Sequence, residues 1–453
     1  MAAKLGFYGG VGSVTGANFL LDTGGLKLLI DCGLIQDDRF ASAENAKPFA
    51  YEPASVNALF VTHAHADHIG RIPKLVKDGF IGAIYSTPPT KALSAVMFRD
   101  AYEVMLQEGK KTGVAPIYEP YDIDKALSLW QSVNYEAEVP LGYGVTAIFS
   151  DAGHILGSAF VSFLRGNKKI IFTGDIGNVP QPLMNSPKIP KGYDYLVMES
   201  VYGDRVHEEV KERSELLKYY ILDTQNKQGT LIIPAFSLER TQGMLLEINN
   251  LVESGEIEPI PTFLDSPLAI EVTSVYRQFA DYLKPELQRQ IKSGDDIFNF
   301  PKLSLAKTVE DSKEIRGVKG AKIIIAGSGM SHGGRILEHE KNYLEDPKTT
   351  LLLVGYQSVG SLGRRLQDGA KRVEIDGTPV KVKATIARIR GYSGHADRDQ
   401  LIDFVAEGGD KAKQVFVTMG EERASLFLVQ RLRDYLGLNA TAPSLNEVVE
   451  VDF

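Results

Sequence analysis

Short hydrophobic runs separated by turn residues dominate the first 200 or so positions of the chain, and this pattern predicts β-strands. Two of the runs flank Asp22-Thr23-Gly24-Gly25, whose residue types favour a hairpin turn. The stretch 89–106 predicts a helix. Several runs are followed by a polar residue, and strand ends of layered α/β folds commonly bind ligands. The predicted strands are 4–8, 17–21, 26–30, 58–62, 145–149, 160–164, 169–173 and 195–198.

The pattern changes from about Val206, where longer amphipathic stretches alternate with strand-like runs. Such alternation predicts helices and a parallel sheet, hence a separate α/β domain of about 170 residues. A chain of 453 residues is also longer than one core usually holds. Strand character returns at 381–390 and again at 414–419. We therefore expect a first domain at 1–205, an inserted domain at 206–380, and a segment at 381–453 that completes the first domain.

Charge is unevenly distributed along the chain. The net charge of −8 argues against a polyanionic partner, because phosphate binding usually accompanies an excess of Lys and Arg. Positions 360–399, however, hold nine basic and five acidic residues. This local basic face is compatible with a polyanion and equally with an ordinary solvated surface.

Cys32 is the single cysteine, so no disulfide forms within the chain, which fits a reducing compartment. The N-terminus leads into the strand at 4–8 without the apolar core of a secretion signal. No apolar run approaches the ~20 residues of a membrane span. The sequence therefore predicts a cytoplasmic protein with no membrane partner.

The strongest chemical signal is His63-Ala64-His65-Ala66-Asp67-His68, directly after the strand predicted at 58–62. Histidine nitrogen and aspartate oxygen are ligands that zinc accepts, and a solvated loop does not explain such a cluster. His154, in Ala152-Gly153-His154-Ile155-Leu156-Gly157-Ser158, and Asp175, in Thr173-Gly174-Asp175, follow later strands. Either one alone would be weak, a turn residue or a satisfied core group. Their order after the cluster predicts a metal site.

These motifs together resemble the metallo-β-lactamase superfamily, which implies an αββα sandwich and two zinc ions. Asp31, in Leu28-Leu29-Ile30-Asp31-Cys32-Gly33, resembles the first motif of the family and would orient a ligand-bearing loop by hydrogen bonds. Two such ions can share and activate a water and clamp both oxygens of a phosphoryl displacement. The implied ligands are His63, His65, His154 and Asp175 for one zinc, and Asp67, His68 and the bridging Asp175 for the other.

The second half of the chain decides the substrate, because this fold serves several hydrolytic reactions. Met198-Glu199-Ser200-Val201-Tyr202-Gly203-Asp204-Arg205 resembles motif A of the β-CASP nucleases, and Arg390-Gly391-Tyr392-Ser393-Gly394-His395-Ala396-Asp397 resembles motif B. The resemblance covers nearly the whole chain and implies an α/β fold with a β-CASP domain inserted into the sandwich. It implies a ribonuclease of the compact bacterial and archaeal type, which hydrolyses single-stranded RNA through a metal-activated hydroxide. The implied catalytic residues are His395 as general acid, Glu199 as its hydrogen-bonded partner, and Asp67.

Three loops of the predicted insert resemble stretches that line the cleft of β-CASP nucleases. They are 327–335, 236–242 and 355–365, and the first is a glycine-rich junction between a strand and a helix, where backbone N–H groups bind anions. A glycine-rich loop alone is often only a turn, and a core position explains Tyr356 as well as base stacking does. The implied phosphate- and RNA-binding residues are Ser237, Arg240, Ser328, Gly329, Ser331, Gly333, Arg335, Tyr356 and Arg364.

The chain departs from the family at Met419, in Phe416-Val417-Thr418-Met419-Gly420-Glu421-Glu422. RNA-acting members have a histidine here that completes the second zinc site, and a thioether is a poor ligand for Zn²⁺. The second site would keep three protein ligands, so that it binds more weakly, fills with the substrate, or prefers Mn²⁺. The DNA-acting branch has an apolar valine at this position, so Met419 also weakens the assignment to RNA.

Three other functions stay open: a DNA nuclease of the same family, a non-catalytic RNA-binding or regulatory member, and a small-molecule hydrolase. Non-catalytic members lose metal ligands, whereas this chain keeps six of them together with Glu199 and His395. A hydrolase of thioesters or lactams does not explain Glu199, His395 or the insert. The sequence does not separate internal cutting from cutting at an end, and a homodimer is compatible with the family.

Overall fold

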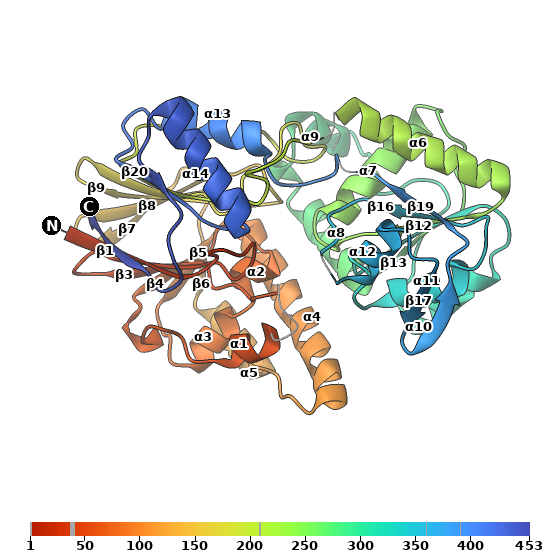
Figure 1. Cartoon of the computed structure of the whole chain (residues 1–453), viewed down its shortest axis with the longest axis horizontal. Coiled ribbons are helices and arrows are strands. Elements are labelled where there is room, and N and C mark those ends of the chain that lie inside the picture. The colour runs from red at the N-terminus through yellow and green to blue at the C-terminus, as the bar shows by residue number, and fades with distance from the viewer. Residues whose placement is uncertain (1, 37–40, 208–209, 359, 390) are drawn as a thin grey trace. The chain divides into compact units, whose positions relative to one another are not determined.

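The computed structural model describes residues 2–36, 41–207, 210–358, 360–389 and 391–453, which form two compact units (Figure 1). Unit 1 contains residues 1–206 and 395–453, and unit 2 contains residues 207–394. The first boundary lies next to the expected one at 205. The second lies beyond the expected one at 380, because β19 (Thr385–Arg388) pairs with a strand of unit 2.

Unit 1 is a sandwich of two seven-stranded sheets with helices on the outside. The first sheet runs in the order β22 (Val448–Asp452), β1 (Ala2–Gly9), β2 (Asn18–Asp22), β3 (Lys27–Ile30), β4 (Ala58–Phe60), β5 (Ala83–Ser86) and β6 (Trp130–Ser132). The second runs β21 (Ala440–Thr441), β20 (Gln414–Val417), β11 (Tyr195–Met198), β10 (Lys168–Phe172), β9 (Ala159–Arg165), β8 (Val145–Asp151) and β7 (Glu138–Gly142).

The inner faces of the two sheets share one hydrophobic core, which includes Phe7, Phe60, Phe163 and Phe172. It combines aliphatic and aromatic side chains, and the rings of Phe60 and Phe163 meet edge to face with centroids 4.8 Å apart. The helices of this unit are α1 (Ala41–Ala46), α2 (Ala66–Ile69), α3 (Ile72–Lys77), α4 (Pro88–Thr112), α5 (Pro120–Ser128), α13 (Arg398–Gly408) and α14 (Glu422–Leu436). The predicted helix at 89–106 corresponds to α4, which Thr87 caps by accepting a hydrogen bond from the N–H of Thr90.

Parallel pairing brings the ends of strands that are distant in sequence to one edge of the sandwich. β3 pairs in parallel with β4, so that Ile30 lies opposite Phe60. β11 pairs in parallel with β10 on one side and with β20 on the other. The residues that follow these strands therefore lie near their neighbours at the carboxyl ends of each sheet, where ligand sites of α/β folds form.

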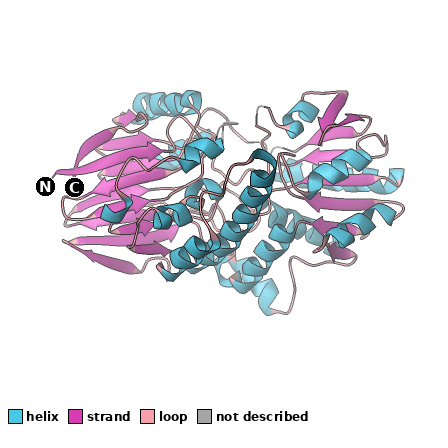
Figure 2. Cartoon of the chain, turned by 90° about the horizontal axis from the view of Figure 1, so that it is seen from below, coloured by secondary structure: helices cyan, strands magenta, loops and turns pink. Residues whose placement is uncertain are grey.

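Unit 2 contains a six-stranded parallel sheet surrounded by helices (Figure 2). Its strands run in the order β14 (Leu303–Leu305), β13 (Thr262–Asp265), β15 (Lys322–Ala326), β12 (Thr230–Pro234), β16 (Thr350–Leu353) and β19. The central strands β12 and β15 are buried along their whole length, as expected for a sheet covered on both faces. The remaining elements are α6 (Val210–Lys227), α7 (Arg240–Glu253), α8 (Pro267–Gln278), α9 (Pro285–Lys292), α10 (Val309–Glu314), α11 (Arg335–Tyr343), α12 (Leu362–Gln367), and the hairpin β17 (Arg372–Ile375) and β18 (Thr378–Lys381).

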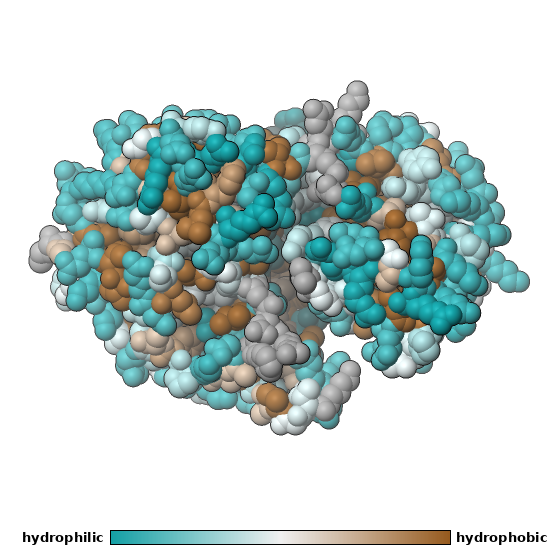
Figure 3. Space-filling model, viewed as in Figure 1, coloured by the Kyte–Doolittle hydropathy of each residue, from teal (hydrophilic) through white to brown (hydrophobic). Residues whose placement is uncertain are grey.

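Hydrophilic side chains cover most of the face seen in Figure 3, and apolar ones are scattered among them. Scattered apolar residues are normal on a protein surface. Within the described ranges, no helix is both long and apolar enough to cross a bilayer.

Candidate metal and nuclease site

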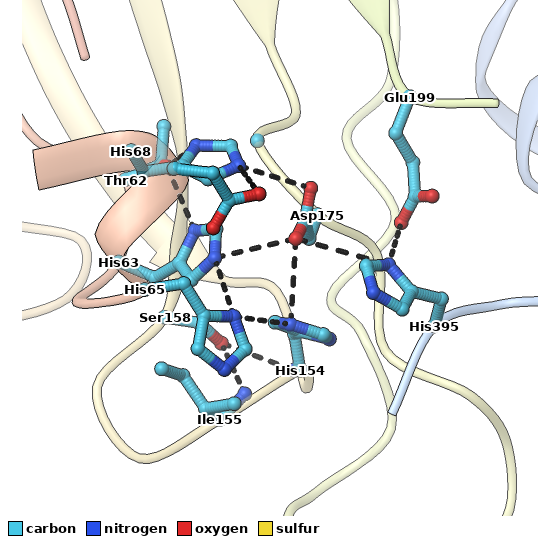
Figure 4. A network of polar contacts seen from close by, with 12 residues as sticks. Thr62, His63, His65, His68, His154, Ile155, Ser158, Asp175, Glu199 and His395 are labelled. Carbon is cyan, nitrogen blue, oxygen red and sulfur yellow. Dashed lines mark hydrogen bonds and ion pairs between the residues drawn. The ribbon is translucent and has the colours of Figure 1, made fainter. Parts of the chain in front are cut away.

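The histidine cluster lies at the carboxyl end of β4, and Asp31 lies beside it at the end of β3. The two carboxylate oxygens of Asp31 accept hydrogen bonds from the backbone N–H and the hydroxyl of Thr62, both at 2.8 Å. Asp31 Oδ2 also lies 2.7 Å from Nδ1 of His68. This contact turns Nε2 of His68 away from Asp31 and towards Asp175 (Figure 4). Both carboxylate oxygens of Asp31 are therefore used to orient Thr62 and His68.

Asp175 occupies the centre of the cluster (Figure 4). Its Oδ2 atom lies 3.3 Å from Nε2 of His63 and 3.5 Å from Nε2 of His154. Its Oδ1 atom lies 3.3 Å from Nε2 of His68. The preceding Gly174 has a φ of 51°, and a Cβ atom there would come 2.5 Å from Oγ1 of Thr62. Only glycine lets the chain pass Thr62 and present Asp175 to the histidines.

The atoms that could hold metal ions divide into two groups that share Asp175. His63, His65, His154 and Asp175 each offer one atom within 4.8 Å of the others. On the other side, Nε2 of His68 lies 3.8 Å from a carboxylate oxygen of Asp67. In the described part of the chain, Nε2 of His68 and Oδ1 of Asp175 are buried polar atoms without a hydrogen-bond partner. Buried polar atoms are rarely left unpaired, and a bound cation would satisfy both.

The loop that carries His154 is shaped by its neighbours rather than by the histidine. The hydroxyl of Ser158 accepts hydrogen bonds from the backbone N–H groups of His154 and Ile155 at 3.0 and 3.2 Å. Gly153 has a φ of 65°, and its N–H donates to Asp151. Both ends of the loop are therefore fixed, which places the imidazole of His154 opposite His65, with ring nitrogens 3.2 Å apart.

His395 and Glu199 stand on the other side of Asp175 (Figure 4). Nδ1 of His395 lies 3.3 Å from Oε1 of Glu199 and 3.7 Å from Oδ2 of Asp175. The Glu199 carboxylate is buried and also accepts the backbone N–H of Ile176 at 2.6 Å. Backbone pairing holds His395 in place, through a bridge with Gly177 and a 2.7 Å hydrogen bond from Ala396 to Ile176. Arg390, the first residue of the motif, lies outside the described residues.

Burial and neighbouring charged groups shift the pKa of each histidine in the site. Burial disfavours the charged form of His395, but Glu199 and Asp175 outweigh it and raise the pKa of His395 to about 9. Burial likewise opposes the charge of His68, and Asp175 and Asp31 hold its pKa well above the usual range. His65 has the opposite balance, because burial and the neighbouring His63 and His154 hold its pKa well below that of a free imidazole. These pKa shifts are those of the protein without bound cations.

Comparison with known proteins places this geometry in a family. Three family models match successive parts of the chain: a metallo-beta-lactamase superfamily domain at residues 20–192, a Beta-Casp domain at 241–366, and a Zn-dependent metallo-hydrolase RNA specificity domain at 379–443. The chain is 34% identical over 421 residues to Ribonuclease TTHA0252 of Thermus thermophilus, an alignment that covers 93% of this chain and 94% of that protein. The chain belongs to the β-CASP family of the metallo-β-lactamase superfamily.

Further relatives agree with this placement. The chain is 31% identical to Transcription termination factor FttA of Methanosarcina mazei, over 98% of this chain and 71% of that protein. It is 29% identical to an RNase J-like protein of Methanocaldococcus jannaschii, over 99% of both. A crystal structure of a protein of unknown function from Enterococcus faecalis aligns over the full length of both chains with a TM-score of 0.58 at 13% identity, which shows a shared fold.

Family membership confirms three predictions from the sequence: the family itself, the α/β fold with an inserted β-CASP domain, and the class of metal-dependent hydrolytic nuclease. The His/Asp cluster and the superfamily together indicate binding of a divalent metal. The match to an RNA specificity domain supports RNA as the partner.

Met419 is the residue that the sequence analysis expected to occupy the place of a metal-binding histidine. It follows β20, has a φ of 45°, and is only 2% exposed. Its N–H donates to the carbonyl of Gly10 at 2.7 Å, and its side chain belongs to the same core as Phe7 and Phe19. The thioether therefore packs as an apolar group.

The predicted RNA-binding residues lie in loops that follow parallel strands of unit 2, or in the first turn of the helices after those loops. Most of their polar side chains bind other parts of that unit. Arg335 donates to Asp265 at 2.5 Å and to the carbonyls of Ala306 and Lys307. Arg364 pairs with Asp368, and Arg240 donates to the carbonyl of Val354. Ser237 contacts Ser266, Ser328 accepts the N–H groups of His332 and Gly333, Gly329 accepts from Gln357, and Ser331 donates to Glu340.

Two aromatic side chains are exposed among these loops. Tyr356 is 45% exposed, which is not the core position that the sequence left open. Phe236 follows β12 and is 39% exposed, and a Cβ atom on Gly329 would come 2.8 Å from its ring. The sequence-based prediction did not include Phe236 among the binding residues, although an aromatic residue at the start of the predicted loop at 236–242 was a readable signal.

Glu340 is a second residue that the sequence did not single out. It is fully buried on α11, and its carboxylate accepts a hydrogen bond from the hydroxyl of Ser331 at 2.5 Å. Burial raises the pKa of Glu340 to about 7, against the opposing effect of Ser331. The unfolded chain releases this proton near the ordinary glutamate pKa, whereas the folded chain keeps it up to about pH 7. Folding stability therefore falls as pH rises through this window, by at most about 3 kcal/mol.

Glu340→Gln is expected to remove this loss of stability. The amide stays neutral, so the melting temperature of the variant relative to the wild type should rise between pH 5 and pH 8, as measured by thermal unfolding at both pH values. The control is Glu338→Gln, an exposed neighbour on the same helix, whose difference from the wild type should not change with pH. Parallel curves for Glu340→Gln and the wild type would show that Glu340 is already charged in the folded protein.

Proposed function

We propose that the protein is a zinc-dependent ribonuclease that hydrolyses phosphodiester bonds of single-stranded RNA. The observation that carries this proposal is the position of Asp175, whose two carboxylate oxygens face different histidines while His395 and Glu199 stand beside it. One ion would be held by His63, His65, His154 and Asp175, and a second by Asp67, His68 and Asp175. The donor set of imidazole nitrogen and carboxylate oxygen suits zinc.

The buried atoms of the site fit such ions. Nε2 of His68 and Oδ1 of Asp175, which lack hydrogen-bond partners in the described part of the chain, point towards one another across 3.3 Å. When bound, divalent ions lower the pKa of a water molecule and offset the negative charge that develops on the phosphoryl oxygens.

The chain's own residues would supply the proton for the leaving oxygen. Nδ1 of His395 lies 3.3 Å from Oε1 of Glu199, a contact that would orient the imidazole for donation to the leaving oxygen. The neighbouring Glu199 carboxylate favours the protonated imidazole, and the His395 side chain is 23% exposed, so that a substrate can reach it. Asp31 would act indirectly, by fixing the orientation of the His68 ring.

The loops of unit 2 would bind the RNA strand. Phe236 and Tyr356 offer exposed rings on which bases can stack, a contact that tolerates any sequence. Arg240, Arg335 and Arg364 already make hydrogen bonds within unit 2, so that phosphate would be met by backbone N–H groups and by the remaining donors of each guanidinium.

A DNA nuclease remains the second candidate, and the observation that favours it is the packed thioether of Met419. A non-catalytic RNA-binding member is less well supported, because six metal ligands, Glu199 and His395 are all in place around one site. The cytoplasmic location and the homodimer stay predictions.

Cleavage of end-labelled nucleic acid tests the proposal. Single-stranded RNA labelled at its 5′ end and the matching DNA are incubated with the purified protein and Zn²⁺ or Mn²⁺, with Asp175→Ala as the control. We expect cleavage of RNA alone, which the variant loses. Cleavage of DNA would favour the second candidate, and cleavage of neither strand would mean that the protein binds RNA without cutting it.

Met419→His is expected to tighten the second metal site. A fourth protein ligand would raise the affinity for the second Zn²⁺ by about tenfold or more, the scale on which single contacts around a metal act. Isothermal titration with zinc measures this affinity. Met419→Leu keeps an apolar side chain and should match the wild type. Equal affinity in Met419→His and the wild type would show that position 419 does not reach the ion.

A further inference from the structure

Three buried polar side chains of unit 2 take no part in the proposed chemistry, yet they hold the peptide that leads into His395. They are Arg213 on α6, Glu247 on α7, and Tyr392 in the connection after β19, and each is less than a tenth exposed. We call them the clamp. Polar and charged groups of this kind are seldom buried unless they are fully paired.

The members of the clamp are paired with one another and with the backbone. Nε of Arg213 lies 3.3 Å from Oε1 of Glu247, and the guanidinium carbon lies 5.1 Å from the centre of the Tyr392 ring. The Tyr392 hydroxyl donates a short hydrogen bond to Oε2 of Glu247. The guanidinium also donates to the carbonyl of Gly391 at 2.8 Å. Helices α6 and α7 therefore fix both the backbone of Gly391 and the side chain of Tyr392.

The clamp lies close to His395 along the chain. Only Ser393 and Gly394 separate Tyr392 from His395, and an extended chain spans at most about 3.6 Å per residue. His395 and Ala396 are in turn fixed in unit 1 by their pairing with Gly177 and Ile176. The backbone that carries the proposed general acid is thus anchored on both sides, and the clamp supplies the anchor on the N-terminal side.

Stability alone does not account for this arrangement. Removing an arginine and a glutamate from water carries a large desolvation cost, and well-packed apolar residues in their place are often as stable or more so. A phenylalanine could fill the volume of Tyr392 without needing a buried acceptor. What the polar clamp adds is a defined position for the peptide between Gly391 and His395.

We propose that Arg213, Glu247 and Tyr392 are positioning residues for His395, which fix its backbone so that the imidazole meets the leaving oxygen. This inference rests on the proposed function, in which His395 protonates that oxygen. The clamp then contributes to the step that needs a proton and not to metal binding or to RNA affinity. A displacement of about 1 Å is enough to lower the rate of such a step by as much as ~10²-fold.

Two substrates separate positioning from a general structural role. Cleavage of RNA expels a ribose alkoxide as the leaving group, which needs a proton. Hydrolysis of bis(p-nitrophenyl) phosphate releases a stable phenolate, which does not. For Tyr392→Phe we expect kcat on RNA to fall by about 10-fold with KM within about twofold, and the rate on the phenyl ester to stay within about twofold. In a His395→Ala background, Tyr392→Phe should change neither rate further, because the residue it positions is gone.

Tyr343→Phe is the matched control, since it removes another buried tyrosine hydroxyl of unit 2, one without a hydrogen-bond partner among the described residues. Metal content and melting temperature are measured for every variant, and Glu247→Gln provides a second substitution of the clamp. An unchanged kcat on RNA for Tyr392→Phe and Glu247→Gln would overturn the inference, and so would an equal loss on both substrates or a further loss without His395. Failure of the wild type to cut RNA would overturn the proposed function instead and the inference with it.

Discussion

Replacing Asp175 by alanine is expected to abolish detectable cleavage of RNA, with a loss of about 10³-fold or more. Asp175 is the residue shared by both groups of ligands, because Oδ2 faces His63 and His154 while Oδ1 faces His68. Its removal weakens both proposed ions at once. Metal ions contribute several kcal/mol of transition-state stabilisation, and each 1.36 kcal/mol corresponds to a factor of ten in rate.

The measurement for Asp175→Ala combines single-turnover cleavage of labelled RNA with elemental analysis of bound zinc. Asp194→Ala is the control, because Asp194 precedes β11 whereas Glu199 follows it, so that Asp194 lies at the opposite end of the same strand. The control should keep both metal and activity. Full metal content in Asp175→Ala would contradict a bridging role, even if activity were lost.

The clustering of the candidate ligands could be predicted from the sequence because these residues closely follow buried strands. The runs at 26–30 and 58–62 were predicted as strands, and their parallel pairing places Asp31 beside Thr62. The tight turns at Gly153 and Gly174 then aim His154 and Asp175 inwards. Each of these features is local, since a short motif carries both the strand end and the functional side chain.

The contacts that the sequence could not give are those between distant segments without a motif. Arg213 and Glu247 stand on helices whose amphipathic pattern predicted only buried and exposed faces, and nothing local shows that they meet Tyr392. Arg335 in its glycine-rich loop was expected to bind phosphate, yet a carboxylate of its own unit, Asp265, lies 2.5 Å from it. The predicted boundary at 380 leaves β19 outside the insert, because no local feature of the sequence shows that β19 pairs with β16.

The second large effect is expected for His395→Ala, which should lower kcat on RNA by about 10²–10⁴-fold, the usual contribution of a general acid. The imidazole stands 3.3 Å from Glu199, and the carboxylates of Glu199 and Asp175 favour its charged form against burial. The rate on bis(p-nitrophenyl) phosphate should change little, because the phenolate leaves without a proton. Added imidazole should restore part of the RNA cleavage.

Metal content decides how a loss of activity in His395→Ala is interpreted. Asp175, Glu199 and His395 also offer three atoms close enough to hold a cation, so the histidine has a second conceivable role as a ligand. A general acid can be removed without loss of bound zinc, whereas a ligand cannot. Two zinc ions per chain in the variant, with slow cleavage of RNA and normal hydrolysis of the phenyl ester, would establish His395 as the proton donor. A variant that loses an ion and slows equally on both substrates would instead assign His395 to the metal site, and Glu199 would then be its orienting carboxylate.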